Sequence, residues 1–404
     1  MISNSIRIRT LFAIYIVFIL PHAAFAQEDA DAAYLTKFHE QFPKVEPVPV
    51  LADYATPQRF DQLYLGEALD KALGTVSNET GGIAWGLAYT MIALNQMFRN
   101  THDAKYLVAN LRCIDAVFAA RDDRTGVALW TGEVAPAWSS GKYAERGRAV
   151  FAVHTGMILY PIFDCLLLLR ETPETLAADS PRYRELLAEA LKTLAFHDSQ
   201  WRNGPGEDEG HYVGKNQENI LEGKVLPGNR LSAMGRALWA AWKLTGDETH
   251  RDRALRMGRY IKHRLSLGVD GAYYWPYWLP DEPVTGVVER STVNGEDTSH
   301  GQLTASFPFM LAAEGQVFDD EDIRRFGLTV LNGIARLGDG VLMGSVTGDP
   351  KSNPSLASSP EGWLEPARVV PEVRDRIVTF YLNYVPTPGA LDLATLVAHA
   401  GQTQ

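Results

Sequence analysis

Residues 156–170 read GMILYPIFDCLLLLR, and a helix made from this stretch is apolar on almost every side. Three further stretches have the same character: GIAWGLAYTMIALNQMFRN at 82–100, SAMGRALWAAWKLTG at 232–246 and GQLTASFPFMLAAEG at 301–315. Their first residues lie 74, 76 and 69 positions apart along the chain. A helix that is apolar all round is buried all round, and recurrence at a near-constant period indicates a repeat architecture. We therefore predict four buried helices that belong to one internal repeat.

An amphipathic helix is predicted after each of these buried helices. Polar turns lead into sequences with one apolar stripe at 105–121, 182–197, 250–265 and 323–337. The Asp, Thr and Glu residues of such turns are typical of helix starts. Alternation of buried and half-buried helices is typical of an inner ring wrapped by an outer one. We predict an all-α fold, an α/α toroid of five to seven helical hairpins with little β-structure. An open helical solenoid is the alternative.

The remaining secondary structure is predicted from less regular stretches. Further helices are expected at 60–73, 372–383 and 390–399. The segment 271–279 is expected to form a short hairpin or a loop. The segment 344–363 is rich in Gly, Pro and Ser and is expected to be a loop.

Residues 1–26 have the composition of a secretory signal peptide. Arg7 and Arg9 precede an apolar run of ten, LFAIYIVFIL, and the segment ends in AFA, with small residues at the cleavage positions. The run is shorter than the about 20 residues that span a membrane. We predict a mature chain of 27–404, one toroid catalytic domain that is periplasmic or secreted and not held in a membrane after cleavage of the signal. An uncleaved N-terminal anchor is the alternative.

The chain is acidic, with 38 Lys and Arg against 49 Asp and Glu and a net charge of −11. Loss of Arg7 and Arg9 with the signal peptide takes this charge to −13. Nucleic acid is therefore excluded as a partner, because phosphate binding needs a basic face. An anionic substrate would need a local basic site that outweighs the overall field. Cys113 and Cys165 lie in apolar helical runs and are expected either to pair or to be two buried thiols.

The sequence carries no motif for a bound cofactor. It contains no phosphate-binding loop, dinucleotide-binding glycine pattern, HExxH pair or nucleophile elbow. We expect neither a cofactor nor a catalytic metal. The acidic run GEDEGH at 206–211 matches no calcium loop in its spacing and is expected to be a solvated turn.

Polar residues lie at the predicted start of every buried helix. The inner helices of such a ring point the same way, so their N-terminal ends meet at one mouth, where the helix dipoles add positive potential. The polar groups at the four starts are Asn78, Glu79 and Thr80; Arg146, Arg148 and His154; Asn229 and Arg230; and Glu296, Asp297 and His300. We expect these groups to be neighbours in space and to form a site that binds a carboxylate and moves a proton.

Aromatic side chains are concentrated beside these positions. The run YYWPYW at 273–278 is too dense to lie entirely in the core, so we expect part of it to line the cleft. Sugar rings present apolar faces that stack on aromatic rings, although buried packing is the usual role of such side chains.

The toroid pattern, the secretion signal, the YYWPYW run and the segment EDTSHG at 296–301 together resemble the α/α-toroid polysaccharide lyases. Among these, the chain is most similar to the alginate and glucuronan lyase group, polysaccharide lyase family 38. The resemblance covers most of the mature chain and implies β-elimination on a polyuronate. Such an enzyme neutralises the C5 carboxylate, removes the C5 proton and protonates the departing O4.

The resemblance implies roles for particular residues. Asn229 and Arg230 are expected to bind the carboxylate. Tyr274 is expected to be the acid, and also the base if nearby positive charge lowers its pKa; Tyr277 is the reserve. His211 or His300 is the alternative base. Substrate binding is expected from Trp85, Glu79, Arg148, His154, Tyr212, Trp275, Tyr277 and Glu296.

Two other functions fit the same sequence features. A glycoside hydrolase would need a pair of carboxylates, available from Glu79, Glu218, Glu296 and Asp297. A non-catalytic carbohydrate-binding protein would use the same aromatic side chains but would not need ionisable groups at every helix start. The sequence does not distinguish between oligomeric states.

Overall fold

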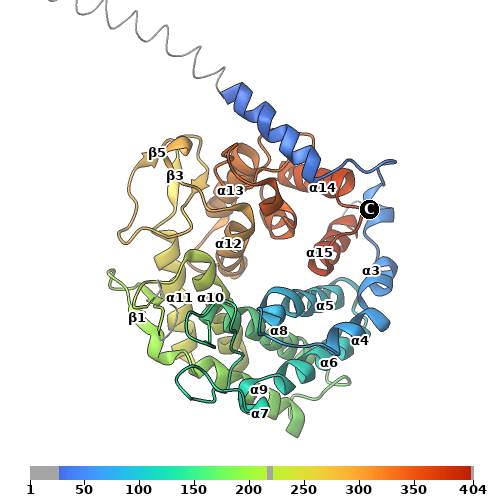
Figure 1. The fold of residues 1–404 in the computed structure, drawn as a ribbon, viewed down its shortest axis with the longest axis vertical. Coiled ribbons are helices and arrows are strands. Elements are labelled where there is room, and N and C mark those ends of the chain that lie inside the picture. Colours follow the sequence, from blue (N-terminus) through green and yellow to red (C-terminus); the bar gives the residue numbers. More distant parts are fainter. Residues whose placement is uncertain (1–26, 216–221, 402–404) are drawn as a thin grey trace, which may run out of the picture.

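The computed structural model describes residues 27–215 and 222–401. The predicted signal peptide and Glu218 lie outside the described residues. Within them, the helices form a closed ring in two layers, with small strands on one side (Figure 1).

The inner layer runs once around the ring. Its elements are α5 (Ala88–Thr101), α8 (Ala152–Glu171), α10 (Gly228–Thr245), α12 (Thr298–Ala313), the 3₁₀ helix η7 (Glu361–Arg368) and α15 (Ala390–Ala400). Each packs against the next, and α15 packs against α5, so the layer closes on itself.

The outer layer covers the inner one helix by helix. Its members are α6 (Lys105–Ala119), α9 (Pro181–Ala195), α11 (Glu248–Lys262), α13 (Asp320–Thr329), α14 (Glu372–Tyr384) and α3 (Pro57–Tyr64). The first five each pack on the inner element that precedes them, and α3 packs on α15. The fold is therefore the predicted α/α toroid, with a number of hairpins inside the predicted range.

Short elements connect these helices. The helical ones are α2 (Leu51–Tyr54), α4 (Glu67–Leu73), η1 (Ile83–Leu87), α7 (Asp122–Thr125), η2 (Asp198–Gln200), η4 (Arg290–Thr292), η5 (Val330–Ile334) and η6 (Pro354–Ala357). The strands are β1 (Trp201–Asn203), β2 (Gly210–Tyr212), β3 (Ser266–Gly268), β4 (Tyr273–Tyr274) and β5 (Val287–Val288). β1 pairs with β2, and β3 lies between β4, which is antiparallel to it, and β5, which is parallel.

Three inner helices begin earlier than their apolar runs. α8, α10 and α12 start at Ala152, Gly228 and Thr298, which is three or four residues before the predicted starts at 156, 232 and 301. The first turn of a helix has unbonded backbone N–H groups and readily takes polar side chains. His154, Asn229, Arg230 and His300, which were expected just before the helices, therefore lie within their first turns.

The helix α8 is the most thoroughly buried element of the ring. By length and composition it is apolar enough to cross a membrane, yet 89% of its apolar window is buried inside the protein, in the inner layer. Cys165 of α8 and Cys113 of α6 are both buried and free, which agrees with the expectation of two buried thiols.

Two segments differ from their predicted form. The predicted loop at 344–363 contains η6 and the start of η7, which supplies one of the inner positions of the ring. The acidic turn at 206–211 is only partly solvated, because Glu209 is buried and its carboxylate pairs with Arg264 at 3.1 Å. Charge at a turn therefore did not predict exposure, because the partner arginine comes from a distant part of the chain.

The helix over residues 27–41 docks against the C-terminal third of the chain. The Tyr34 hydroxyl donates to the Leu342 carbonyl oxygen at 2.8 Å, and Arg336 forms an ion pair with Asp31. The N-terminal segment is thereby joined to residues about 300 positions further on.

Two inner helices approach each other closely at Gly156. A Cβ atom at this position would lie 2.5 to 2.6 Å from the backbone of Ala233 and Met234 in α10. Backbone atoms held in a helix cannot move aside as a flexible side chain can. Gly156 therefore fixes the distance between α8 and α10.

We predict that Gly156→Ala lowers the free energy of unfolding by about 1–3 kcal/mol or more, the usual cost of overpacking. Gly86→Ala is the matched control, because a Cβ there meets nothing within 4 Å; it should be neutral or add up to about 1 kcal/mol. Denaturant unfolding of both variants measures the difference. Equal stability of the two would contradict the close approach.

Candidate active site

The first turns of four consecutive inner segments carry residues at equivalent positions. Trp85, His154, Arg230 and His300 each lie three residues after the N-cap of their helix. All four line one cavity of about 320 Å³, although more than 200 residues separate the first from the last. The inner helices therefore present their N-terminal ends to a common site, as the repeat predicted. We call this cavity the rim cavity.

The remaining walls of the rim cavity are mostly aromatic or apolar. They are formed by Tyr143, Phe151, Val153, Asn229 and Tyr277. A cavity of this size suits one sugar ring, since ligand pockets span about 300–1,000 Å³. Aromatic walls with a few polar groups among them are typical of such pockets.

His154 is held as a neutral imidazole. Three aromatic rings surround it, those of Trp85, Tyr143 and Phe151, with centroids 5.3 to 5.4 Å away. Burial, with a smaller contribution from the charge of Arg230, lowers the pKa of His154 to about 3. The ring is therefore uncharged at any pH near neutrality.

The tautomer of His154 follows from its bond to Asn78. The Asn78 side-chain oxygen accepts from the Ala84 N–H at 3.2 Å, and its Nδ2 donates to the Trp138 carbonyl at 2.9 Å. This orients the other Nδ2 hydrogen toward His154 Nδ1, 3.2 Å away, so that Nδ1 accepts. The proton of the neutral ring then lies on Nε2, and His154 serves the cavity as a hydrogen-bond donor.

His300 forms a carboxylate–imidazole pair with Asp297. Its Nδ1 lies 2.6 Å from Asp297 Oδ2, while Asp297 Oδ1 caps α12 by accepting from the His300 backbone N–H at 3.0 Å. Burial alone raises the pKa of Asp297, but the hydrogen bonds from His300 and Ser299 outweigh it and hold that pKa below the usual range. The pair orients the imidazole with Nε2 as its remaining nitrogen, the arrangement of a general base.

Asn229 and Arg230 bring amide and cationic groups to the same cavity. Asn229 is 2% exposed, and its side-chain oxygen has no hydrogen-bond partner among the described residues. The charge of Arg230 acts on His154, as the lowered pKa of that ring records. Arg230 thus brings a positive charge to the cavity, where the N-terminal ends of the helix dipoles add to it.

Glu296 lies behind the site and is not one of the residues that line the cavity. It is buried, and its Oε2 accepts from Trp275 Nε1 at 2.6 Å and from the Thr304 hydroxyl at 2.7 Å. Burial raises the pKa of Glu296 to about 8, so the carboxyl is largely protonated at neutral pH. Glu296 and Trp275, both predicted to bind substrate, instead support α12 from within.

Tyr274, the first choice for the acid, is not brought to the rim cavity. Its ring is buried in β4, and its hydroxyl donates to Asp270 at 2.7 Å. Burial, followed by the hydrogen bond to Asp270, raises the pKa of Tyr274 above its usual value. The reserve choice, Tyr277, does line the cavity, with its ring 5.3 Å from that of His300.

His211 and Tyr212 are also placed away from the rim cavity. Both lie in β2, where the His211 ring packs against Tyr260 and Tyr212 packs against Trp201. Burial lowers the pKa of His211. These residues were predicted from their chemistry, but their strand belongs to a small sheet outside the line of helix starts.

Glu79 and Arg148 form an ion pair beside the cavity and not within its lining. Arg148 also donates to the Ser139 hydroxyl at 2.9 Å, and the Glu79 carbonyl accepts from Ser140 at 2.8 Å. The pair therefore fixes the loop that carries Tyr143 against the segment before η1.

Three contributors to the site were not predicted as such. Tyr143 and Phe151 come from the loop before α8 and have no regular pattern that identifies them. Asn78 was noted only for its place before a buried helix, and its contact with His154 depends on the fold. Within the described residues, no group of three or more His, Cys, Asp or Glu side chains is placed to hold a metal ion.

We predict a stability change with pH that depends on Glu296. A carboxyl whose pKa is raised to about 8 binds more protons in the folded than in the unfolded chain. The contribution of Glu296 to the free energy of unfolding therefore falls as the pH rises from about 4.5 through 8. Glu296→Gln, which keeps the shape and the neutral form, should raise the melting temperature at pH 9 by at least about 2 °C, raise it less at pH 6 and change it little near pH 4.5. A pH-independent difference in melting temperature would show that Glu296 is ionised in the native state.

Comparison with known proteins gives fold similarity at low identity. No protein-family model matches the chain, and no curated protein matches it. A D-mannose isomerase structure is 12% identical with a TM-score of 0.49, over 78% of this chain and 86% of that one. The α-1,6-mannanase GH76A of Salegentibacter sp. HEL1_6 is 13% identical with a TM-score of 0.47, over 87% and 98%. An inactive variant of that mannanase, in complex with α-1,6-mannotriose, is 13% identical with a TM-score of 0.48 over the same shares. The assignment of the fold rests on the arrangement of the helices themselves.

Proposed function

We propose that this chain is an enzyme that acts on an acidic carbohydrate and cleaves a polyuronate by β-elimination. The observation that carries the proposal is the make-up of the rim cavity. It combines a cation, a neutral imidazole donor and a carboxylate-paired imidazole within aromatic walls of about one sugar's size.

The first task is recognition of the C5 carboxylate. Arg230 supplies the charge, Asn229 an amide and His154 its Nε2 hydrogen, all from the first turns of inner helices. Charge-assisted hydrogen bonds of this kind are the strong ones. By drawing negative charge toward the carboxylate oxygens, these groups make the neighbouring C5–H more acidic.

The second task is removal of the C5 proton, which we assign to Nε2 of His300. Asp297 holds the imidazole in orientation and stabilises the imidazolium that forms. The electrons of the C5–H bond form a double bond between C5 and C4, and the bond from C4 to O4 breaks. The atoms balance without any co-reactant.

The third task is protonation of the departing O4, which we assign to the Tyr277 hydroxyl. Its ring lies edge-on to His300, so an acid and a base are adjacent in one cavity. Trp85 and Tyr143 offer ring faces or edges to the apolar side of the sugar.

The glycoside hydrolase alternative is less well supported, because it needs two carboxylates at the substrate. Among the described residues that line the rim cavity there is no Asp or Glu. Asp297 is engaged by His300, Glu296 is buried behind the site, and Glu79 is paired with Arg148. A purely binding protein would have no use for the His300–Asp297 pair.

We further propose that the enzyme acts after export, on the basis of residues 1–26.

The first prediction concerns the product. Incubation with polyglucuronate, polymannuronate, polyguluronate, pectin and glycosaminoglycans should give, with at least one polymer, an unsaturated end that absorbs in the ultraviolet. New reducing ends without this absorbance would identify a hydrolase instead. Binding without any product would favour a carbohydrate-binding protein.

The second prediction separates the two tyrosines. Tyr277→Phe should lower kcat by about 10²- to 10⁴-fold, the usual contribution of a positioned acid or base. Tyr274→Phe is the matched control, because that hydroxyl is bonded to Asp270 outside the cavity; its kcat should stay within about threefold of the parent. Steady-state kinetics on the polymer that is cleaved measures both. Loss of activity only in the Tyr274 variant would reverse the assignment.

A further inference from the structure

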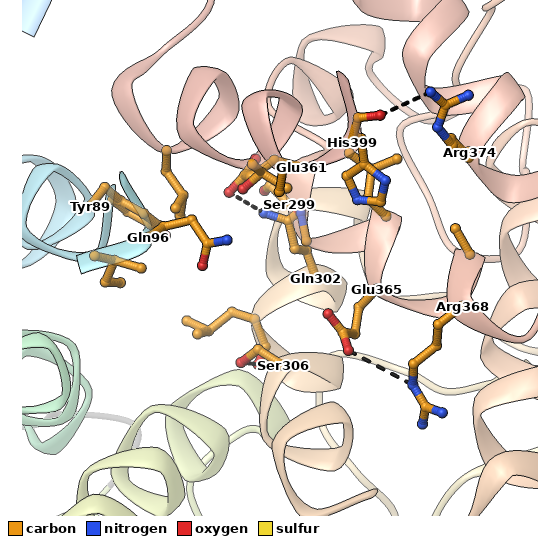
Figure 2. A pocket seen from close by; sticks show the side chains of 18 of the residues that line it. Tyr89, Gln96, Ser299, Gln302, Ser306, Glu361, Glu365, Arg368, Arg374 and His399 are labelled. Atoms are coloured by element: carbon orange, nitrogen blue, oxygen red, sulfur yellow. Dashed lines mark hydrogen bonds and ion pairs between the residues drawn. The ribbon is translucent and has the colours of Figure 1, made fainter. Parts of the chain in front are cut away.

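A second and larger cavity lies inside the ring. It has a volume of about 600 Å³ and is bounded by α5, α10, α12, η7, α14 and α15; Figure 2 shows side chains that line it. None of its lining residues lines the rim cavity. The function proposed above therefore does not use it. We call it the central cavity.

Arg236 of α10 brings an uncompensated positive charge to the central cavity. It is only 8% exposed, and its guanidinium lies 4.6 Å from the ring centroid of Tyr160 and donates to Met157 Sδ at 3.1 Å. Its Nε has no hydrogen-bond partner, and no carboxylate of the described residues lies within ion-pair distance. Asp164 is the carboxylate whose charge acts on Arg236, and it is already paired with Arg99.

Two other buried arginines of this fold, unlike Arg236, form ion pairs with carboxylates. Arg121 and Arg264 are both fully buried, and each forms ion pairs, with Asp123 and Glu189 in one case and with Glu209 in the other. A buried cation is costly unless it is paired. The unpaired Arg236 at a cavity wall therefore points to a partner that is supplied from outside the chain.

Glu361 offers the cavity a group of a different kind. It is 4% exposed, and its Oε1 accepts from Gln302 Nε2 at 2.9 Å, as Figure 2 shows, while its Oε2 has no partner among the described residues. Burial and the neighbouring Asp392 raise the pKa of Glu361 well above its usual range. The carboxyl is thus a neutral hydrogen-bonding group, which does not repel an anion and can serve a hydroxyl.

We propose that the central cavity is a binding site for a small polyhydroxylated carboxylate of the uronic acid class. Arg236 pairs with the carboxylate, and Glu361 with Gln302 bonds the hydroxyl groups. The volume lies within the range of small-molecule sites, about 300–1,000 Å³. Ser299 and Ser306, which Figure 2 places on the same wall of α12, add further hydroxyl partners.

The test is a calorimetric titration of the full chain with D-glucuronate and with D-glucose, its neutral counterpart. The Arg230→Met variant is the host protein, so that carboxylate binding at the rim cavity does not contribute. We expect one glucuronate per chain and at least about tenfold weaker binding of glucose, the usual effect of losing a hydrogen bond to a charged group. Equal affinity for the two sugars, or no binding, would overturn the proposal.

Two further variants in the same host locate the binding. Arg236→Met should weaken the binding of glucuronate by roughly 10- to 100-fold, to the affinity measured for glucose. Arg374→Met is the matched control, since Arg374 lines the same cavity but donates to the His399 carbonyl at 3.0 Å; it should change affinity by less than about threefold. The reverse pattern would overturn the role of Arg236.

The melting temperature separates a binding role from a structural one. Removal of an unpaired buried charge should leave the melting temperature of the ligand-free Arg236→Met protein unchanged or higher. Glucuronate should raise the melting temperature of the host protein and not that of the Arg236→Met variant. A clearly lower melting temperature of the ligand-free variant would make Arg236 a structural residue and would also overturn the proposal. These binding and melting results do not depend on whether any polymer of the panel above is cleaved, so the two proposals can fail separately.

Discussion

The inner helices of this ring must run parallel and pack closely, and the other features of the molecule follow from that constraint. The outer helices return the chain to the same face, so four consecutive inner segments start at one rim. Gly156 shows how tight the packing is, because the backbone of Ala233 occupies the place of its missing side chain. Parallel packing also sets like ends of helix dipoles side by side, which is unfavourable unless the rim binds negative charge. A site for an anion at this rim is thus favoured by the architecture as well as by individual residues.

The ring handles its carboxyl groups in two ways. At the rim, Asp297 is ionised because hydrogen bonds from His300 and Ser299 stabilise the charge. Inside, Glu296 and Glu361 have raised pKa values because the protein removes water without supplying a cation. These two buried carboxyl groups are neutral, whereas the buried carboxylates of Glu209 and Asp164 are each paired with an arginine.

The sequence predicted the ring well and the site in part. Helices that are apolar all round have few alternatives to burial, so their number and order followed from the pattern. Their starts were placed late, because first-turn residues such as His154 and His300 are polar and resemble a loop. The sequence could not predict which of Tyr274 and Tyr277 lines the cavity, because this depends on which residues of the YYWPYW run enter β4. His211 was misplaced because its chemistry fits a site to which its strand does not lead. The missed inner element, η7, begins in a stretch rich in Gly, Pro and Ser, whose burial depends on its neighbours and not on its own composition.

The docking of residues 27–41 against the segment around Leu342 has a consequence for biogenesis. Both this contact and the closure of α15 on α5 join parts of the chain that are synthesised far apart in time. A nascent polypeptide therefore cannot close the ring until α15 has been synthesised. Such late closure delays the final compaction of the ring until its two distant ends have both been synthesised.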